Sequence, residues 1–223
     1  MKGAVAAVFK RDLILAWLGG AGAAAPLGFF VGATVLVPLA IGADGKMLAL
    51  IGPPLLWVSA ALAALMTLER VFQADLEDGA LDQMLLARAP FEALVLAKGA
   101  AAWVAVGGTI ALAAAPLALT MQAPLLSLPI IFIDMAIGMI AFFGTGLLAA
   151  ALAAGVRRAG VLIAWLVLPF YAPPIIFGAA ATAAAARGEG LFTPPFLLLA
   201  GCALAALALG PIGAAAAARL QAE

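Results

Sequence analysis

Histidine is absent from this chain of 223 residues, and cysteine occurs once, at Cys202. The lack of histidine removes the side chain used most often to bind metals, to ligate haem iron and to shuttle protons near neutral pH. A single cysteine excludes a disulfide framework and a cysteine-rich zinc site. We therefore predict no catalytic centre and no metal site in this chain.

Charged residues are also scarce. They make up 10% of the chain, with 11 Lys and Arg balancing 11 Asp and Glu, whereas hydrophobic residues make up 67%. Soluble domains carry roughly 25% charged and 45–50% apolar residues. The composition excludes a water-soluble globule, and the absence of net positive charge argues against nucleic-acid binding. Most of the chain is expected to lie in lipid.

Long apolar runs are abundant. A spanning helix needs about 20 mainly apolar residues, because a helix rises about 1.5 Å per residue and the hydrocarbon layer is about 30 Å thick. The runs are continuously apolar, without the alternation typical of membrane strands. The sequence predicts an all-α integral membrane protein whose six transmembrane helices cover residues 24–41, 48–68, 93–121, 128–154, 161–183 and 195–217.

Basic residues indicate how these spans are oriented. With the N-terminus inside, nine of the 11 basic residues fall on the inner side, and only Lys46 and Arg187 fall outside. Cytoplasmic segments retain Lys and Arg, so the N- and C-termini are both predicted to be cytoplasmic.

Residues 2–18 predict an amphipathic, interfacial helix on the inner membrane surface. The residues expected to face lipid, at a spacing of four, are Val5, Phe9, Leu13 and Trp17. Lys10 and Arg11 are expected to point toward lipid headgroups. Asp12 falls within the apolar arc, which indicates that it meets another protein group there; a frayed helix end is the alternative.

One long polar segment, residues 69–92, holds six of the 11 acids. Asp78 is expected to cap a short helix, with Gly79 easing the turn and Pro90 permitting a stop. The apolar face of this helix is expected to consist of Leu81, Met84 and Leu85. Two interpretations remain open. The segment is either a solvated loop or a docking element whose apolar face and carboxylates suit a groove on a soluble partner.

Two features lie inside the predicted spans. Asp134 is about seven residues from the outer end of the fourth span, where solvation at the interface competes with a functional role. Pro169, Pro173 and Pro174 lie near the centre of the fifth span, remove backbone donors and are expected to kink it. The kink serves either as a hinge or only to shape the bundle.

Several stretches of the chain resemble one family. They are Trp57, Leu68–Leu86, Leu96–Lys98, Gly155–Leu162, Leu168–Pro169 and Pro173, together with Pro26–Phe30 and Val37–Gly42. In these stretches the sequence resembles CcmB, the haem exporter permease of the cytochrome c maturation ABC system. The resemblance runs from about Phe9 to the last span and is most specific at Asp75–Gly79.

The resemblance implies one ABC-type permease domain over residues 1–223, in the bacterial cytoplasmic (inner) membrane and paired as a homodimer. It also implies an ATPase subunit, CcmA, the membrane subunits CcmC and CcmD, and the haem chaperone CcmE. No nucleotide-binding loop of the form G-x-x-x-x-G-K-[ST] occurs in the chain. The chain is therefore expected to bind no cofactor directly, with ATP hydrolysed by one partner and haem handled by others.

By the same resemblance, residues 69–92 are the cytoplasmic coupling segment. The residues expected to contact the ATPase subunit are Glu69, Arg70, Phe72, Asp75, Leu76, Asp78, Gly79, Leu81 and Asp82. The apolar members would fill a groove on the partner, and the aspartates would fix the register.

The first functional hypothesis is ATP-driven motion that releases haem-loaded chaperone from a neighbouring subunit. It rests on the shortage of axial haem ligands, because only Tyr171, Cys202 and seven methionines are candidates. Direct haem export through the dimer interface is the second hypothesis. The alternatives are an ABC permease for a lipid or drug and a secondary transporter. A secondary transporter needs charged residues at mid-membrane on broken helices, which Asp134 supports poorly.

Overall fold

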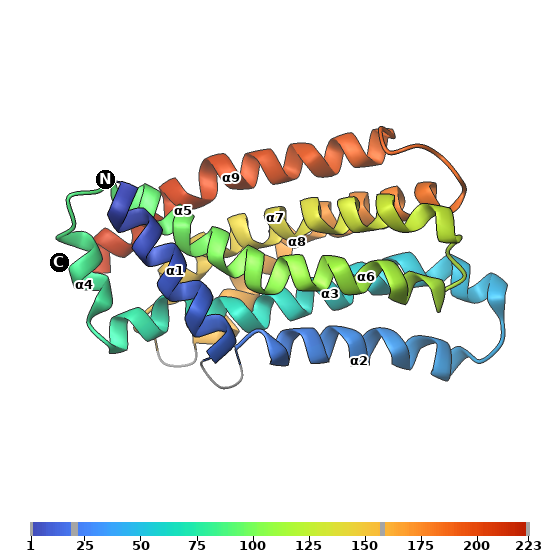
Figure 1. Ribbon diagram of the computed structural model, residues 1–223, viewed down its shortest axis with the longest axis horizontal. Helices are drawn as coiled ribbons and strands as arrows, with labels where there is room; N and C mark the ends of the chain where they lie inside the picture. Colours follow the sequence, from blue (N-terminus) through green and yellow to red (C-terminus); the bar gives the residue numbers. More distant parts are fainter. Residues whose placement is uncertain (1, 19–21, 157–158, 222–223) are drawn as a thin grey trace.

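The computed structural model describes residues 2–18, 22–156 and 159–221. Figure 1 shows long helices lying side by side, with α1 (Lys2–Leu18) crossing them obliquely at one end. The first and last described helices bring both ends of the chain to that same end. We call it the inner end, following the distribution of basic residues, and the opposite end the outer end.

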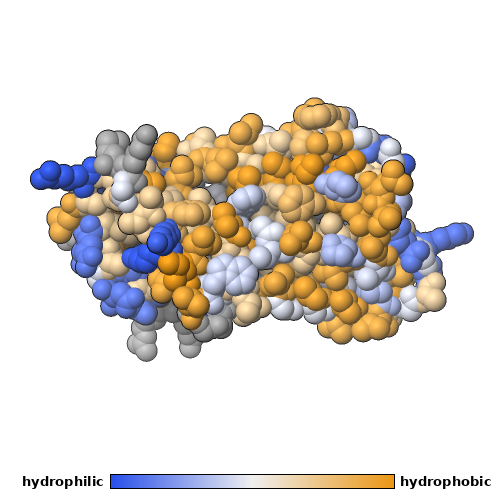
Figure 2. Space-filling view, viewed as in Figure 1, coloured by the Kyte–Doolittle hydropathy of each residue, from blue (hydrophilic) through white to orange (hydrophobic). Residues whose placement is uncertain are grey.

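Within the described residues, six helical segments are long and apolar enough to cross a membrane. They are α2 (Ala24–Ile41), α3 (Gly45–Glu77), α5 with α6 (Phe91–Ala102 and Gly108–Leu119), α7 (Leu128–Ala153), α8 (Ala159–Ala186) and α9 (Pro194–Gln221). Figure 2 shows hydrophobic residues over the middle of the molecule and hydrophilic residues toward its two ends. The expected all-α protein with six spans is confirmed.

The second span is longer than predicted. Helix α3 begins at the outer end, where the Asp44 carboxylate accepts the backbone N–H groups of Lys46 and Met47 at 3.1 Å. It then continues past Leu68 to Glu77 at the inner end. No glycine or proline interrupts these last nine residues, so charged side chains there do not end the helix.

The turn after α3 differs from the prediction as well. The Asp78 N–H donates to the Ala74 carbonyl and closes α3, and no side chain caps the short helix α4 (Ala80–Leu85). The expected capping role of Asp78 is therefore wrong. Gly79, with φ of 69°, supplies the left-handed residue between the two helices. Pro90 does not end α4 but directly precedes α5.

The centre of the bundle is built around the indole of Trp57, which is fully buried in α3. Its ring lies between Gly138 of α7 and Gly178 of α8, and its Nε1 donates to the Thr182 hydroxyl at 2.9 Å. Phe142 packs edge-on against the same ring, with centroids 6.1 Å apart. One aromatic side chain thus joins three spans, and glycine makes the space for it.

Helices α7 and α9 also approach closely through small residues. Gly144 of α7 faces Ala206 and Gly210 of α9, where an added methyl group at Gly210 would strike the Gly144 carbonyl. Lipid tails are as apolar as Leu, so helices in a membrane associate through such close backbone contact.

The third span contains a π-helix, η1 (Trp103–Gly107), between α5 and α6. Trp103 Nε1 donates to the Ala136 carbonyl of α7 at 3.1 Å. A short 3₁₀ turn, η2 (Leu125–Ser127), leads from α6 into α7 at the outer end. The hydrogen bond of Trp103, the first residue of the π-helix η1, therefore attaches this wide turn to α7.

Helix α8 runs without interruption from Ala159 to Ala186 through its three prolines. Pro174 is buried, whereas Pro169 and Pro173 are exposed. The assignment of these residues as a hinge stays a prediction.

We predict that Gly138→Ala destabilises the bundle by about 1–3 kcal/mol, because the new methyl group would overlap the Trp57 ring. Gly32→Ala in α2 is the matched control, since nothing lies within 4 Å of the added methyl group there. Thermal unfolding in detergent measures both variants. Equal unfolding temperatures for the two would contradict the packing described for Trp57.

Candidate functional site

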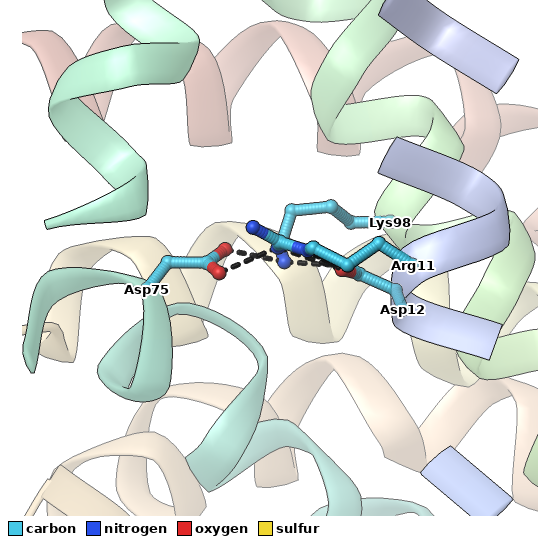
Figure 3. A network of polar contacts seen from close by, with 4 residues as sticks. All are labelled: Arg11, Asp12, Asp75 and Lys98. Atoms are coloured by element: carbon cyan, nitrogen blue, oxygen red, sulfur yellow. Dashed lines mark hydrogen bonds and ion pairs between the residues drawn. The ribbon is translucent and has the colours of Figure 1, made fainter. Parts of the chain in front are cut away.

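Four charged side chains meet at the inner end of the bundle, and we call them the charge cluster (Figure 3). They are Arg11 and Asp12 of α1, Asp75 of α3 and Lys98 of α5. Arg11 contacts Asp75 at 2.6 Å and Asp12 at 2.7 Å. Lys98 Nζ contacts Asp12 Oδ2 at 2.6 Å and Asp75 Oδ2 at 2.5 Å. Each cation therefore bridges both anions.

Burial makes the charge cluster sensitive to the loss of any member. The Lys98 and Asp75 side chains are 3% and 8% exposed, and Asp12 is 15% exposed. The ammonium group also lies 5.8 Å from the centroid of the Phe72 ring. Two positive and two negative charges cancel, so the removal of one partner leaves an unbalanced charge in a site with little water.

The Arg11 guanidinium is the most exposed member, at 35%. Burial lowers its pKa, but hydrogen bonds and attraction from Asp12 and Asp75 outweigh that effect and raise the pKa above its ordinary value. Arg11 thus stays charged, and it ties α1 to α3.

The charge cluster corrects one prediction for α1 and confirms another. Arg11 turns inward to Asp75 and does not point to lipid headgroups, because a buried carboxylate binds it more strongly than water-exposed lipid. Asp12 meets Lys98, as its place within the apolar arc predicted.

The apolar stripe of α1 differs from the prediction too. Val5 and Leu13 pack against the core of the bundle, so they do not face lipid, and Phe9 is half-buried. The exposed large apolar residues of α1 lie in its second half, at Ile14, Leu15, Trp17 and Leu18. The reason is that α1 packs along α5, which covers one side of the stripe.

The opposite side of the inner end of α3 holds the link between α7 and α8. Gln73 Oε1 accepts the backbone N–H of Gly155 at 3.1 Å, and Gln73 Nε2 donates to Glu77 at 2.8 Å. The Glu69 carboxylate lies close to Gly160 in the first turn of α8. The inner end of α3 is therefore attached to α1 and α5 on one side and to the α7–α8 link on the other.

The nine residues predicted to contact the ATPase subunit separate into three groups by burial. Phe72, Asp75 and Leu81 are buried and contact other parts of the chain, whereas Leu76 and Gly79 are half-buried. The exposed members are Glu69, Arg70, Asp78 and Asp82. Only this exposed group offers full side chains to a soluble protein.

Helix α4 presents its predicted apolar face inward. Leu81 and Met84 are buried, and Leu85 is half-buried against the core. Leu86, directly after the helix, is 85% exposed beside exposed Asp82 and Gln83. A large apolar side chain surrounded by polar groups is typical of a contact surface for a partner.

Lys98 is the residue that sequence reasoning missed. It falls among apolar residues near the start of the third span, and a lone lysine at that depth signals a buried partner. Asp12, an acid within an apolar arc, gave the complementary signal, and the two side chains contact each other in the structure.

A groove of about 170 Å³ lies between the third span, α7 and α9. Its walls are Leu96, Gly99, Ala100, Trp103, Ile140, Phe143, Gly144, Leu147, Leu207 and Pro211. None of these side chains is a ligand for haem iron. Among the residues that the structure describes, no group of acids and cysteine could hold a metal ion.

We predict that Lys98→Met costs about 3–5 kcal/mol of stability, because it leaves Asp12 and Asp75 with one cation instead of two. The control is Arg219→Met, which breaks the exposed pair with Glu92 and should cost at most about 1 kcal/mol. Thermal unfolding in detergent compares them, and trypsin cleavage after Lys10 reports release of α1. Similar losses for both variants would show that the charge cluster does not hold α1.

Comparison with known proteins covers nearly the whole chain. The family model for CcmB protein matches residues 3–221. Heme exporter protein B of Bradyrhizobium diazoefficiens is 39% identical over 216 residues, which are 97% of each chain. The protein of the same name from Paracoccus denitrificans is 40% identical over 96% of this chain and 98% of its own length.

A more distant relative has the same name. Heme exporter protein B of Escherichia coli K12 is 35% identical over 215 residues, 96% of this chain and 97% of that protein. These relatives are bacterial, and the six spans agree with a multi-pass protein of the inner membrane. A match of this extent and identity shows that the chain belongs to the CcmB family.

Proposed function

We propose that this chain is the permease subunit of an ABC transporter complex that exports haem for cytochrome c maturation. Relatives named Heme exporter protein B, aligned over almost their full length, support this role. The sequence has no nucleotide-binding loop, so a separate subunit, CcmA, hydrolyses the ATP.

The ATPase subunit docks on the exposed residues around α4, which we call the coupling surface. It consists of Glu69, Arg70, Asp78, Asp82, Gln83 and Leu86. Leu86 supplies the apolar contact and the acids supply register, while buried Leu81 and Met84 hold α4 on the bundle.

The observation that carries the proposal is the attachment of α3 on both sides. Asp75 joins it to α1 and α5, and Gln73 joins it to the α7–α8 link. A partner that displaces α4 therefore moves the inner ends of several spans together. Motion of this kind suits a subunit whose task is to pass on the energy of ATP hydrolysis.

Haem is held by partner proteins in this proposal. The Tyr171 hydroxyl is buried and donates to the Phe142 carbonyl at 3.0 Å, so it is already occupied. The groove beside Trp103 has no methionine, tyrosine or cysteine in its walls. ATP-driven motion of two copies of this chain then releases haem-loaded chaperone, CcmE, from the neighbouring CcmC and CcmD subunits.

We expect the double variant Asp78→Lys, Asp82→Lys to abolish co-purification with the ATPase subunit while membrane insertion is retained. The two lysines would repel the positively charged groups of the ATPase subunit that the two acids are proposed to contact. Glu189→Lys at the outer end is the control, since its side chain is also exposed and charged. Undiminished co-purification of the double variant would exclude this docking surface.

Haem titration tests the second part of the proposal. The purified chain alone, in detergent, should show no saturable Soret shift at one haem per chain, because the groove beside Trp103 has no axial ligand in its walls and the hollow that Met121 lines holds only about 30 Å³. The measurement is an absorption titration, with the complete complex as the positive control. A one-to-one shift for the isolated chain would favour direct haem passage through this subunit.

A further inference from the structure

Asp134 is a carboxyl group with no protein partner in the described part of the chain. It lies in α7, six residues from Leu128, which places it about 9 Å along the helix from its outer end. The residue is 1% exposed, and neither carboxyl oxygen has a hydrogen-bond partner among the described residues. The charge cluster and the coupling surface do not include it.

The face of α7 that holds Asp134 is closed by other spans. Asp134, Gly138 and Phe142 follow at intervals of four residues, so they share one side of the helix. Gly138 packs on the Trp57 ring of α3, and the same ring packs on Gly178 of α8. The carboxyl group therefore lies one turn from a tightly packed contact of three spans.

Among the described residues, no cation on the helices that pack on α7 forms an ion pair with Asp134. In the described part of the chain, α6 and α8 have no charged residue, and those of α3, α5 and α9 lie toward the helix ends or in the charge cluster. The other titratable groups at membrane depth are Tyr171, which donates to the Phe142 carbonyl, and Cys202 on α9. None of the ion pairs in the described residues involves Asp134.

Magnitudes decide which form of the carboxyl group fits this site. A buried, unpaired carboxylate costs several kcal/mol even after the protein relaxes. A neutral carboxylic acid without a partner costs about 1–3 kcal/mol. The neutral form is therefore the stable one while the three spans remain packed.

We propose that Asp134 is a proton-binding site, which holds a proton while α7 is packed on α3 and α8 and releases it when water enters at the outer end. On release, the carboxyl O–H bond breaks, the proton passes to water and a carboxylate remains. The short distance from the outer end gives water a route once the spans separate. This inference stands apart from haem and from the ATPase subunit, because it needs only the packing of this chain.

Infrared spectroscopy of the full chain in lipid nanodiscs tests the proposal. At neutral pH the wild type should show the carbonyl stretch of a protonated carboxylic acid, and Asp134→Asn should lose that band. Asp44→Asn is the matched control, because Asp44 is exposed at the outer end and asparagine also caps helices. A wild-type spectrum without the band, or a band that survives in Asp134→Asn, overturns the proposal.

The pH dependence of unfolding provides a second test. It distinguishes proton binding at Asp134 from a purely structural role of this residue, which would not make stability depend on pH. The packed state holds a proton on Asp134, whereas the hydrated carboxyl group of the unfolded chain releases it. As pH rises, the stability of the wild type should therefore fall more than that of Asp134→Asn. The asparagine variant keeps the shape of the neutral acid and should fold normally. Parallel curves of unfolding temperature against pH for the two proteins would count against proton binding.

Discussion

Close approach of helix backbones is the constraint on which this bundle depends. Lipid gives neighbouring helices no hydrophobic reason to associate, so contact must come from shape. Gly138 and Gly178 let the Trp57 ring enter between three spans, and Gly144 lets α9 lie directly on α7. The chain is rich in glycine and alanine for this reason, and large side chains face outward to lipid or fill the few central spaces.

Charge is placed where that packing allows it. The charge cluster sits at the inner end, where two cations and two anions neutralise one another and fasten α1 to the spans. Asp134 is the exception, a carboxyl group inside the packed bundle with no hydrogen-bond partner among the described residues. These acids therefore have different roles. The acids of the charge cluster stabilise one arrangement of the helices, whereas Asp134 makes the packed arrangement depend on a bound proton.

The sequence predicted the spans and the helix before them because hydrophobic length and local composition decide those features. The inward face of Leu81 and Met84 followed from helical spacing, and the protein partner of Asp12 followed from its place among apolar residues. Pairing could not be predicted in the same way. Asp75 and Lys98 are 23 residues apart and meet only when α3 continues beyond the membrane, which no local signal showed.

The π-helix is a second feature that could not be predicted from the sequence. Residues 103–107 lie in a span that is apolar all round, so hydrophobic pattern gives no sign of a wider turn. Asp78 shows how a local signal misleads, because a good capping residue beside a glycine ended the preceding helix instead.

The length of α3 has a mechanical consequence. With 33 residues it is about 50 Å long, against about 30 Å of hydrocarbon. It is one continuous helix packed at Trp57 against α7 and α8, with about 18 Å of helix, including Pro53 and Pro54, toward the outer end and about 30 Å toward the inner end. A tilt about that fulcrum moves the outer end in the opposite direction, by roughly three-fifths of the inner displacement. In the proposed coupling, a push from the cytoplasm would reach the far side of the membrane reversed in direction and smaller in amplitude.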